Sequence, residues 1–514
     1  MARRIQSRIK IKGKLKAQTP LHFGGNEIDP DTDLALAVNG RGNYYLAGTN
    51  LTGLLREWMF QTVENSEISE SETVINNLWG FQEGDTGHAS HVLVEDGEIT
   101  LPDGLTTEIR DHVGINRQWG TAADRQKYDR QVVPKGSTID LNLTLEISDL
   151  QNSPHNNPND LSQTANLLAQ LLQDLKDKKQ GLRIGGGKTR GLGKVQLVNL
   201  EISEQRGLLE IGGILDALRD KWPPFELEPS RNIIKSPQLK ITVQWKPINS
   251  MMMKAEGEGI AVDILPLVSG NDRNLSLVMA GSSIKGILRS QAEKIVRTVS
   301  NLDLPDQFLT QVQVDLVKTL FGNAASIDTG KQQGYQGALA IDDCYSETVF
   351  SAEQWDRIVN AKDSKELTEF IQTLEEELSS MQQAYHVAID RWTGGAADGA
   401  LYSVLEPMGI QWHPLELTLD LKRLKRKEAD SDYLPRIALL FLVLRDLMNR
   451  RIPIGFGTNR GMGDITVQEI SFEGMNSITE LDNPEDDGIL NNEELLEKLT
   501  KAWQDWMARK GVTA

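Results

Sequence analysis

Residues 184–193 read Ile-Gly-Gly-Gly-Lys-Thr-Arg-Gly-Leu-Gly, and residues 454–463 read Ile-Gly-Phe-Gly-Thr-Asn-Arg-Gly-Met-Gly. These stretches, the first and second glycine loops, share six positions, including four glycines and the arginines Arg190 and Arg460. The offset between them is the same at both ends, because 454 − 184 equals 463 − 193. A glycine-rich turn with the same arginine, repeated so far along the chain, indicates that the chain holds two copies of one domain.

Both loops are suited to bind phosphate. Glycines reach left-handed backbone conformations and leave their N–H groups uncovered, and an arginine can bind phosphate oxygens through two N–H groups. A nucleotide-binding P-loop is disfavoured, because it needs a glycine where Leu182 stands and a helix afterwards, whereas residues 194–202 alternate as a strand does. The plain alternative, a structural glycine-rich hairpin, is disfavoured by the repetition of the arginine.

Size and composition are those of a globular protein with more than one domain. The chain has 514 residues, of which 39% are hydrophobic and 25% charged, so each half can bury a core. Its one cysteine, Cys344, allows neither an intrachain disulfide nor a cysteine-rich zinc site. No apolar run reaches membrane length and no signal peptide is recognisable. We therefore expect a cytoplasmic protein that does not contact a membrane.

The net charge of −18 argues at first against nucleic-acid binding, but the charge is unevenly distributed. Residues 1–16, 176–194 and 422–427 are basic, while acids gather near residues 64–72, 375–377 and 482–497. Because exposed charges are screened over about 8 Å at physiological salt, a basic groove can act locally on an acidic protein. Charge alone equally allows ordinary solvated faces.

Other landmarks recur in the same order in the two halves. Ala47–Arg56, with the pattern of a strand end turning into a helix, is matched by Ala280–Arg289. The further pairs are Leu78–Gly80 with Leu320–Gly322, His112–Arg117 with His386–Arg391, Ala122–Asp124 with Ala396–Asp398, and the strand at Ile139 with Leu415–Leu421. The offset between partners grows from 281 − 48 at the helix starts to 386 − 112 at the polar excursions, which indicates extra helical material near residues 352–383.

Each copy reads as strand, helix, strands, a polar excursion, strand, helix, glycine loop and strand. This order predicts an α+β fold with helices on one face of an antiparallel sheet, of the βαββαβ ferredoxin or RNA-recognition type. We expect a first domain over residues 1–205, a linker over 206–237, a second domain over 238–474, and an acidic tail with an amphipathic helix over 475–514.

These motifs together resemble the RAMP superfamily of CRISPR proteins. The carriers are Pro20–Gly25, the two Gly-Thr/Ser helix starts, the two excursions beginning Ile-Asn/Asp-Arg, and the glycine loops. The chain is most similar to backbone subunits of type III effector complexes, here as two fused copies like those of type III-D systems. The resemblance implies two ferredoxin-like RAMP domains that stack along a guide RNA, each with a thumb insertion.

The resemblance also implies roles for particular residues. The helix starts and glycine loops would hold the guide backbone, and the excursions would act as thumbs that wedge into the guide–target duplex. The implied RNA-binding residues are Gly48, Thr49, Asn50, Arg56, Gly185, Gly186, Gly187, Lys188, Arg190, Gly281, Ser282, Ser283, Lys285, Arg289, Gly455, Gly457 and Arg460. The implied thumb residues are Asn116, Arg117, Trp119, Asp390, Arg391 and Trp392, where the alternative for the two tryptophans is core packing.

In such subunits an aspartate after the first strand supports metal-dependent cleavage of the target RNA. The first copy offers Asp33, in preference to Asp29 and Asp31, and the second offers Asp263. A carboxylate that holds Mg²⁺ or Mn²⁺ beside substrate phosphates is ordinary for hard cations, although a loop aspartate is more often a turn cap. The second copy departs from the family pattern, because Met251–Met253 stands where His22–Gly24 would be.

Three functions remain open from the sequence. The chain is a guide-bound backbone subunit that also cleaves target RNA, a backbone without catalysis, or an endonuclease that matures the guide with His22 as its base. The replacement of His22 by Met251 in the second copy disfavours the last function. The implied partners are the guide CRISPR RNA, complementary target RNA, other RAMP subunits, a large polymerase-like subunit and a small subunit.

Overall fold

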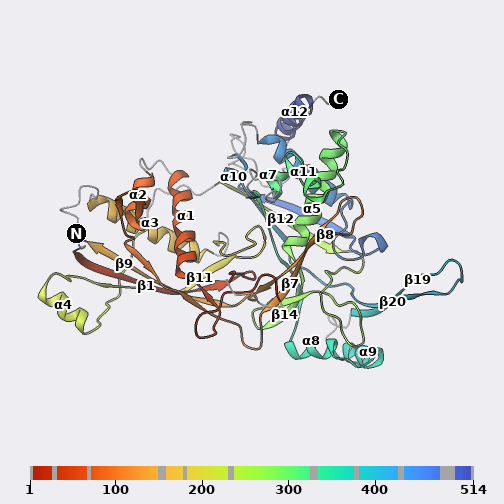
Figure 1. The fold of residues 1–514 in the computed structure, drawn as a ribbon, viewed down its shortest axis with the longest axis horizontal. Helices are drawn as coiled ribbons and strands as arrows, with labels where there is room; N and C mark the ends of the chain where they lie inside the picture. The colour runs from red at the N-terminus through yellow and green to blue at the C-terminus, as the bar shows by residue number, and fades with distance from the viewer. Residues whose placement is uncertain are drawn as a thin grey trace. The chain divides into compact units, whose positions relative to one another are not determined.

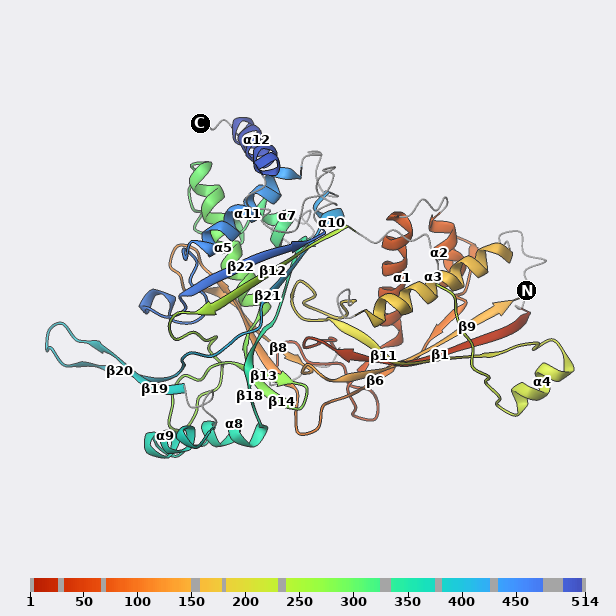
Figure 2. The ribbon, with the colours of Figure 1, turned by 180° about the vertical axis from the view of Figure 1, so that it is seen from behind.

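The computed structural model describes residues 4–25, 32–65, 71–148, 158–177, 182–229, 237–323, 334–374, 381–425, 433–474 and 493–510 (Figures 1 and 2). The chain divides into two compact units. The first comprises residues 1–102, 131–186 and 193–236, and the second comprises 103–130, 187–192 and 237–514. Two pieces of the first sequence repeat, including the tip of its glycine loop, thus pack within the second unit.

The first unit is built on an antiparallel sheet in the order β11 (Val195–Gln205), β1 (Ile5–Ala17), β9 (Thr138–Ser148), β6 (Gly97–Thr100) and β2 (Tyr45–Leu46), with β5 (Val92–Val94) also on β9. Apolar and basic side chains alternate along β1, so Ile9, Ile11 and Leu15 are buried on one face. Helices α1 (Gly48–Asn65), α2 (Ser71–Trp79) and α3 (Pro158–Lys176) pack on this face (Figure 1). The strand that follows the first glycine loop is β11, as the sequence predicted.

The sheet of the second unit repeats this strand order, but its edge strand comes from the first repeat. Its sheet has the order β10 (Arg190–Gly191), β17 (Leu339–Asp342), β21 (Leu415–Asp420), β12 (Gln238–Pro247) and β22 (Ile465–Glu473). Helices α5 (Gly281–Val299), α11 (Leu434–Met448) and α12 (Glu493–Arg509) belong to its core. The short strand β10 comes from the first glycine loop and pairs in parallel with β17. The edge of the second sheet is therefore completed by the first repeat.

Both excursions are β-hairpins. The first hairpin consists of β7 (Glu108–Ile115) and β8 (Ala122–Val132), and the second of β19 (Met381–Ile389) and β20 (Ala396–Pro407). The second hairpin projects from the second unit (Figure 2). The expected helical insertion is present as α8 (Ala352–Val359) and α9 (Ser364–Thr373).

The remaining elements are short, apart from a small sheet of β13 (Val268–Asn271), β14 (Asn274–Met279) and β18 (Cys344–Phe350). They are β3 (Phe81–Glu83), β4 (Thr86–His88), α4 (Ile211–Leu218), α6 (Phe308–Gln311), α7 (Val317–Phe321), β15 (Gly322–Asn323), β16 (Tyr335–Gln336), α10 (Leu421–Lys425) and a 3-10 turn at Thr458–Arg460. Among the described residues, no helix has the length and apolarity needed to span a membrane.

Candidate functional site

The glycine loops owe their composition to backbone geometry. In the first loop Gly185, Gly187, Gly191 and Gly193 have positive φ angles of 76°, 74°, 93° and 98°, and the four matching glycines of the second loop are also positive. Gly186 does not have a positive φ, and the second repeat replaces it with Phe456. The glycines that recur in both loops are therefore those whose left-handed backbone an L side chain would strain.

The arginine of each loop is held by a tyrosine of the adjacent hairpin. In the first repeat, Arg190 Nη1 donates to the hydroxyl of Tyr128 at 2.9 Å. The Tyr128 ring stacks on His112 with centroids 4.9 Å apart and planes inclined by 22°. The guanidinium is thus positioned by a neutral hydroxyl, which leaves its charge uncompensated by this contact.

The second repeat builds the same arrangement. Arg460 Nη1 donates to the hydroxyl of Tyr402, whose ring stacks on His386 at 5.3 Å. His386 and Tyr402 are paired across β19 and β20. The histidine and tyrosine have the same spacing in both repeats, because 128 − 112 equals 402 − 386. Sequence analysis placed the histidines in the two polar excursions and missed the tyrosines, although this repeated spacing was the available signal.

The two sites differ in charge. Beside the first loop lies Arg130, which is only 7% exposed, and its Nε and Nη1 have no hydrogen-bond partner among the described residues. Desolvation and the neighbouring Arg190 lower the pKa of Arg130. The corresponding residue of the second repeat is Val404, which is buried against Met252 and Met462. The first site therefore carries a second guanidinium where the second site is apolar.

At both helix starts an aspartate occupies the position expected for a phosphate. The backbone N–H of Gly48 donates to Asp96 Oδ1 at 2.7 Å, and that of Gly281 donates to Asp343 Oδ1 at 2.8 Å. A carboxylate at a helix N-terminus satisfies a free N–H group and complements the helix dipole. These first amides are therefore engaged within the protein.

Other residues of the helix starts also have protein partners. Lys285 is buried and donates to the carbonyl oxygen of Leu339 at 2.7 Å. Arg289 pairs with Glu293 at 2.7 Å, and Arg56 donates to Asn76 at 2.8 Å. The side chains of Thr49 and Asn50 are exposed, while Ser282 and Ser283 are half-buried. Lys285 in particular supports the fold and does not present its charge at the surface.

The hairpin tips expose their tryptophans. Trp119 is 71% exposed and Trp392 is 95% exposed, which removes the core-packing alternative. Asn116 Oδ1 accepts from the backbone N–H of Gln118, and Asp390 Oδ1 accepts from that of Trp392, at 2.8 and 2.9 Å. Arg391 is exposed. Arg117 instead binds Glu293 at 2.7 Å, so it anchors its hairpin.

A buried cluster fixes the base of the first hairpin within the second unit. Arg110, 5% exposed, lies 3.2 Å from both Glu108 Oε2 and Asp343 Oδ2. Its Nη2 donates to Ser269 Oγ at 2.8 Å. Asp343 is the residue that also caps Gly281. One carboxylate therefore connects the first hairpin to the helix start of the second repeat.

The two proposed cleavage aspartates have different surroundings. Asp33 is exposed, and its competitors Asp29 and Asp31 lie outside the described residues. Asp263 Oδ2 accepts from the backbone N–H of Ser403 at 2.6 Å and from its hydroxyl at 2.9 Å, which lowers the pKa of Asp263. The described part of the chain contains no group of three His, Cys, Asp or Glu side chains that could hold a metal. An ion there would need ligands from elsewhere, for example RNA phosphates.

His22 is unsuited to serve as a solvent-facing base. It is buried, and its Nδ1 lies 2.7 Å from the carbonyl oxygen of Gln131. Its own carbonyl oxygen lies where a side chain on Gly185 would clash. His22 thus braces the first glycine loop.

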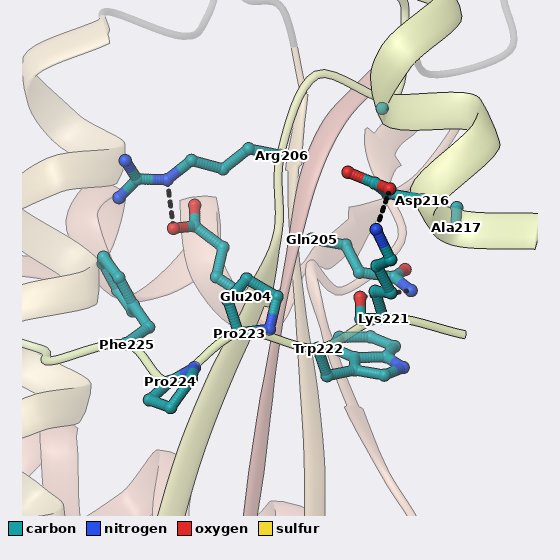
Figure 3. A pocket seen from close by; sticks show the side chains of 11 residues that line it. Glu204, Gln205, Arg206, Asp216, Ala217, Lys221, Trp222, Pro223, Pro224 and Phe225 are labelled. Carbon is teal, nitrogen blue, oxygen red and sulfur yellow. Dashed lines mark hydrogen bonds and ion pairs between the residues drawn. The ribbon is translucent and has the colours of Figure 1, made fainter. Parts of the chain in front are cut away.

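A separate pocket of about 720 Å³ lies in the first unit beneath α4 (Figure 3). Its walls include Trp222 and Phe225 and two ion pairs, Glu204 with Arg206 and Asp216 with Lys221. It contains none of the sequence-predicted site residues. Its lining charges balance, so it lacks the surplus of cations found beside the first glycine loop.

The family assignment agrees with the repeated geometry. The model of the RAMP superfamily matches residues 14–196 and 266–466, and each match includes a glycine loop. The chain belongs to the RAMP superfamily. Members of this superfamily are in general CRISPR-associated RNA-binding proteins that work with other subunits. A search among curated proteins gave no match.

Proposed function

We propose that this RAMP protein binds guide CRISPR RNA as a backbone subunit of a type III effector complex, in the manner of a fused type III-D subunit. The observation that carries the proposal is the arginine–tyrosine–histidine arrangement built twice beside a glycine loop. Tandem copies of one phosphate-binding device suit a repeating polyanion better than a single small ligand.

The strand orders support a ferredoxin-like domain in each repeat. In the first unit the strand after the glycine loop lies beside β1, and β9 lies on the other side of β1. In the second unit β22, β12 and β21 have the same relation. Helices pack on one face of each sheet, as a βαββαβ plan requires.

The second hairpin supports the expectation of further RAMP subunits as partners. The first hairpin finds its receptor within the chain, through Arg110 and Arg117. The second hairpin leaves Tyr385, Val387 and Ile389 exposed, and the corresponding Val113 and Ile115 of the first hairpin are exposed as well. Such a cluster fits a protein or nucleic-acid contact. We propose that it meets the target duplex or a neighbouring subunit in a complex that also holds a large polymerase-like subunit and a small subunit.

We further propose, as the family resemblance implies, that the chain cleaves target RNA at two sites, one at Asp33 and one at Asp263. Support comes from the exposure of both residues and from their place between the first strand and the helix start of each repeat. Bound Mg²⁺ or Mn²⁺ would stabilise the charge that develops at the scissile phosphate. The chain itself would contribute a single carboxylate at each site.

Substitution of the loop arginines tests the RNA-binding proposal. Arg190→Ala and Arg460→Ala should each weaken the binding of single-stranded RNA of any sequence, because each removes a phosphate contact. The slope of log affinity against log salt should fall by about 0.7 per lost contact. Arg451→Ala, an exposed residue paired with Asp446, serves as a matched control. Unchanged affinity and slope in the double arginine variant would reduce both loops to structural turns.

Cleavage is tested in a complex reconstituted with guide, partner subunits and labelled target. Asp33→Ala should remove one product band and Asp263→Ala the other, each by orders of magnitude, since every increment of about 1.4 kcal/mol in the barrier is tenfold in rate. Chelation of divalent ions should remove both bands. If the double variant still cuts at the wild-type positions, the chain is a scaffold without catalysis. Cleavage of precursor RNA by the protein alone would instead indicate guide processing.

A further inference from the structure

Arg130 is anomalous among the buried charges of the second unit. Burying a charged side chain is costly unless it is paired, and the other deeply buried arginine near it, Arg110, contacts two carboxylates. Arg130 has no such partner among the residues that the structure describes, and the neighbouring charge that lowers its pKa is another cation, Arg190. The protein thus holds two like charges together in a place where nothing in the described fold neutralises them.

The surroundings of Arg130 place this charge at the glycine loop. A Cβ atom added at Gly187 would lie 3.0 Å from Arg130 Nη1, so the guanidinium packs directly against the loop backbone. The centre of the Tyr128 ring lies 6.0 Å from the guanidinium carbon of Arg130. Tyr128 also holds Arg190 through its hydroxyl. One tyrosine and one glycine turn therefore keep both arginines in a common site.

The second repeat forms the same glycine loop without a buried arginine at the position of Arg130. Val404 replaces Arg130, Phe456 replaces Gly186, and Thr458 replaces Lys188. The arginine of this loop, Arg460, lies 5.1 Å from the Phe456 ring. The tyrosine–arginine contact survives all three changes. Arg130 is therefore dispensable for building the loop, and its presence in the first repeat requires another reason.

We propose that Arg130 and Arg190 together form an oxyanion site that binds one phosphate group, and that the second repeat lacks this site. Two guanidinium groups offer several N–H donors to the oxygens of one phosphate. Gly187, with no side chain, lets the Arg130 guanidinium pack against the loop that carries Arg190. That the phosphate belongs to RNA rests on the proposed function. It is either an internal phosphodiester or a terminal phosphate, and both present the same oxygens.

Arg130→Met separates a binding role from a structural one. The variant removes the buried charge and keeps much of the volume, so the Tm of the free protein should rise by about 3 °C. The gain in Tm on adding inorganic phosphate, at ionic strength matched with chloride, should shrink at the same time, because a ligand of the native state stabilises it. The general stabilising effect of phosphate on proteins is measured by the matched control Val404→Met, whose response should equal that of the wild type. Arg190→Gln, at a half-buried position, should lose the same response if Arg130→Met does not fold.

Two RNA oligomers of one sequence, with a 5′-hydroxyl or a 5′-monophosphate, identify the source of the phosphate. Loss of about tenfold in affinity for both in Arg130→Met indicates an internal phosphodiester, and loss confined to the phosphorylated oligomer indicates a terminal phosphate. If a folded variant keeps the wild-type response to phosphate and to both oligomers, the site does not exist. If that variant still binds RNA, the proposed function stands and the two-arginine site is wrong. A phosphate response that depends on Arg130, in a protein that binds neither oligomer, preserves the site and overturns the function.

Discussion

The first and second hairpins are equivalent elements of the sequence repeat, but the residues at their bases differ in charge. Glu108 and Arg110 at the base of the first hairpin correspond to Gln382 and Ala384 in the second, at the offset that also relates the two stacked histidines. The charged pair enters the buried cluster with Asp343 and Ser269, whereas the neutral pair makes no ion pair. Both hairpins nevertheless expose a tryptophan at the tip. The tips have thus kept the same exposed residue, while the bases of the two hairpins have diverged in charge.

Removing the charge at the base of the first hairpin should have the largest effect on stability. Arg110→Ala leaves the buried Asp343 and the half-buried Glu108 without their cation, which should cost about 3–5 kcal/mol in the free energy of unfolding. Ala384→Gln at the matching position should change it by less than about 0.5 kcal/mol. Denaturant unfolding followed by tryptophan fluorescence measures both. Equal, small effects would mean that the cluster does not hold the first hairpin.

Neutralising Glu108, Arg110 and Asp343 together separates the contribution of charge from that of shape. Replacing Glu108, Arg110 and Asp343 together by Gln, Met and Asn removes the charges as a set, and stability should recover toward the wild type. Burial raises the pKa of Asp343 to about 6 despite its contact with Arg110. Desolvation is therefore a large part of what this carboxylate costs the fold. A triple variant no more stable than Arg110→Ala would show that shape, not charge, is decisive.

Substitutions at the two hairpin tips should have similar effects, unlike substitutions at the two hairpin bases. Trp119→Ala and Trp392→Ala remove exposed rings, so the free energy of unfolding should stay within about 0.5 kcal/mol of the wild type. If the rings stack on bases of a guide–target duplex, each substitution should weaken binding to that duplex by about 1–3 kcal/mol. Fluorescence anisotropy with a labelled duplex measures this. An effect at one tip only would show that the hairpins have separate tasks.

Much of the architecture follows from the sequence, because it is written in local patterns that occur twice. The alternation along β1, the glycines that begin α1 and α5, and the strand after each glycine loop all depend on near neighbours. The polar excursions around Trp119 and Trp392 left both exposure and core packing open, and the structure decides for exposure. The positive φ angles explain afterwards why Gly186 was free to become Phe456 while its neighbours were not.

Contacts between residues far apart in the chain could not be predicted from these local patterns. Arg110 and Asp343 are 233 residues apart, and nothing local marks either as a partner of the other. The pairing of β10 with β17 transfers the tip of the first glycine loop into the second unit, which a division by repeat does not anticipate. Tyr128 and Tyr402 repeat at a constant spacing from the histidines, but only the structure shows that the paired rings stack. Helix α4 was missed because its apolar side chains face solvent and two glycines interrupt its pattern.

The smallest effect on stability is expected for a contact of the second hairpin, between Ser403 and Asp263. Ser403 on β20 donates twice to Asp263 Oδ2, and these bonds hold the pKa of the carboxyl below its ordinary value. The stability they add is complete above the unfolded pKa of about 3.9 and is lost as pH falls through the lower folded pKa. Because Asp263 is exposed, solvent screening should limit it to less than about 1 kcal/mol.

Ser403→Ala isolates this contact from the rest of the second hairpin. It removes the hydroxyl donor and keeps the backbone donor, so the pKa of Asp263 should rise only part of the way to its ordinary value. The ¹³C carboxyl shift of labelled aspartate, followed from pH 2 to pH 6, measures that rise, with Ser364→Ala on α9 as a control. A carboxylate freed from Ser403 is also more available to a metal ion beside RNA phosphates. If cleavage at the Asp263 site stays constant while the pKa of Asp263 rises, the bond from the Ser403 hydroxyl stabilises the hairpin. It then does not restrain Asp263 as a reacting group.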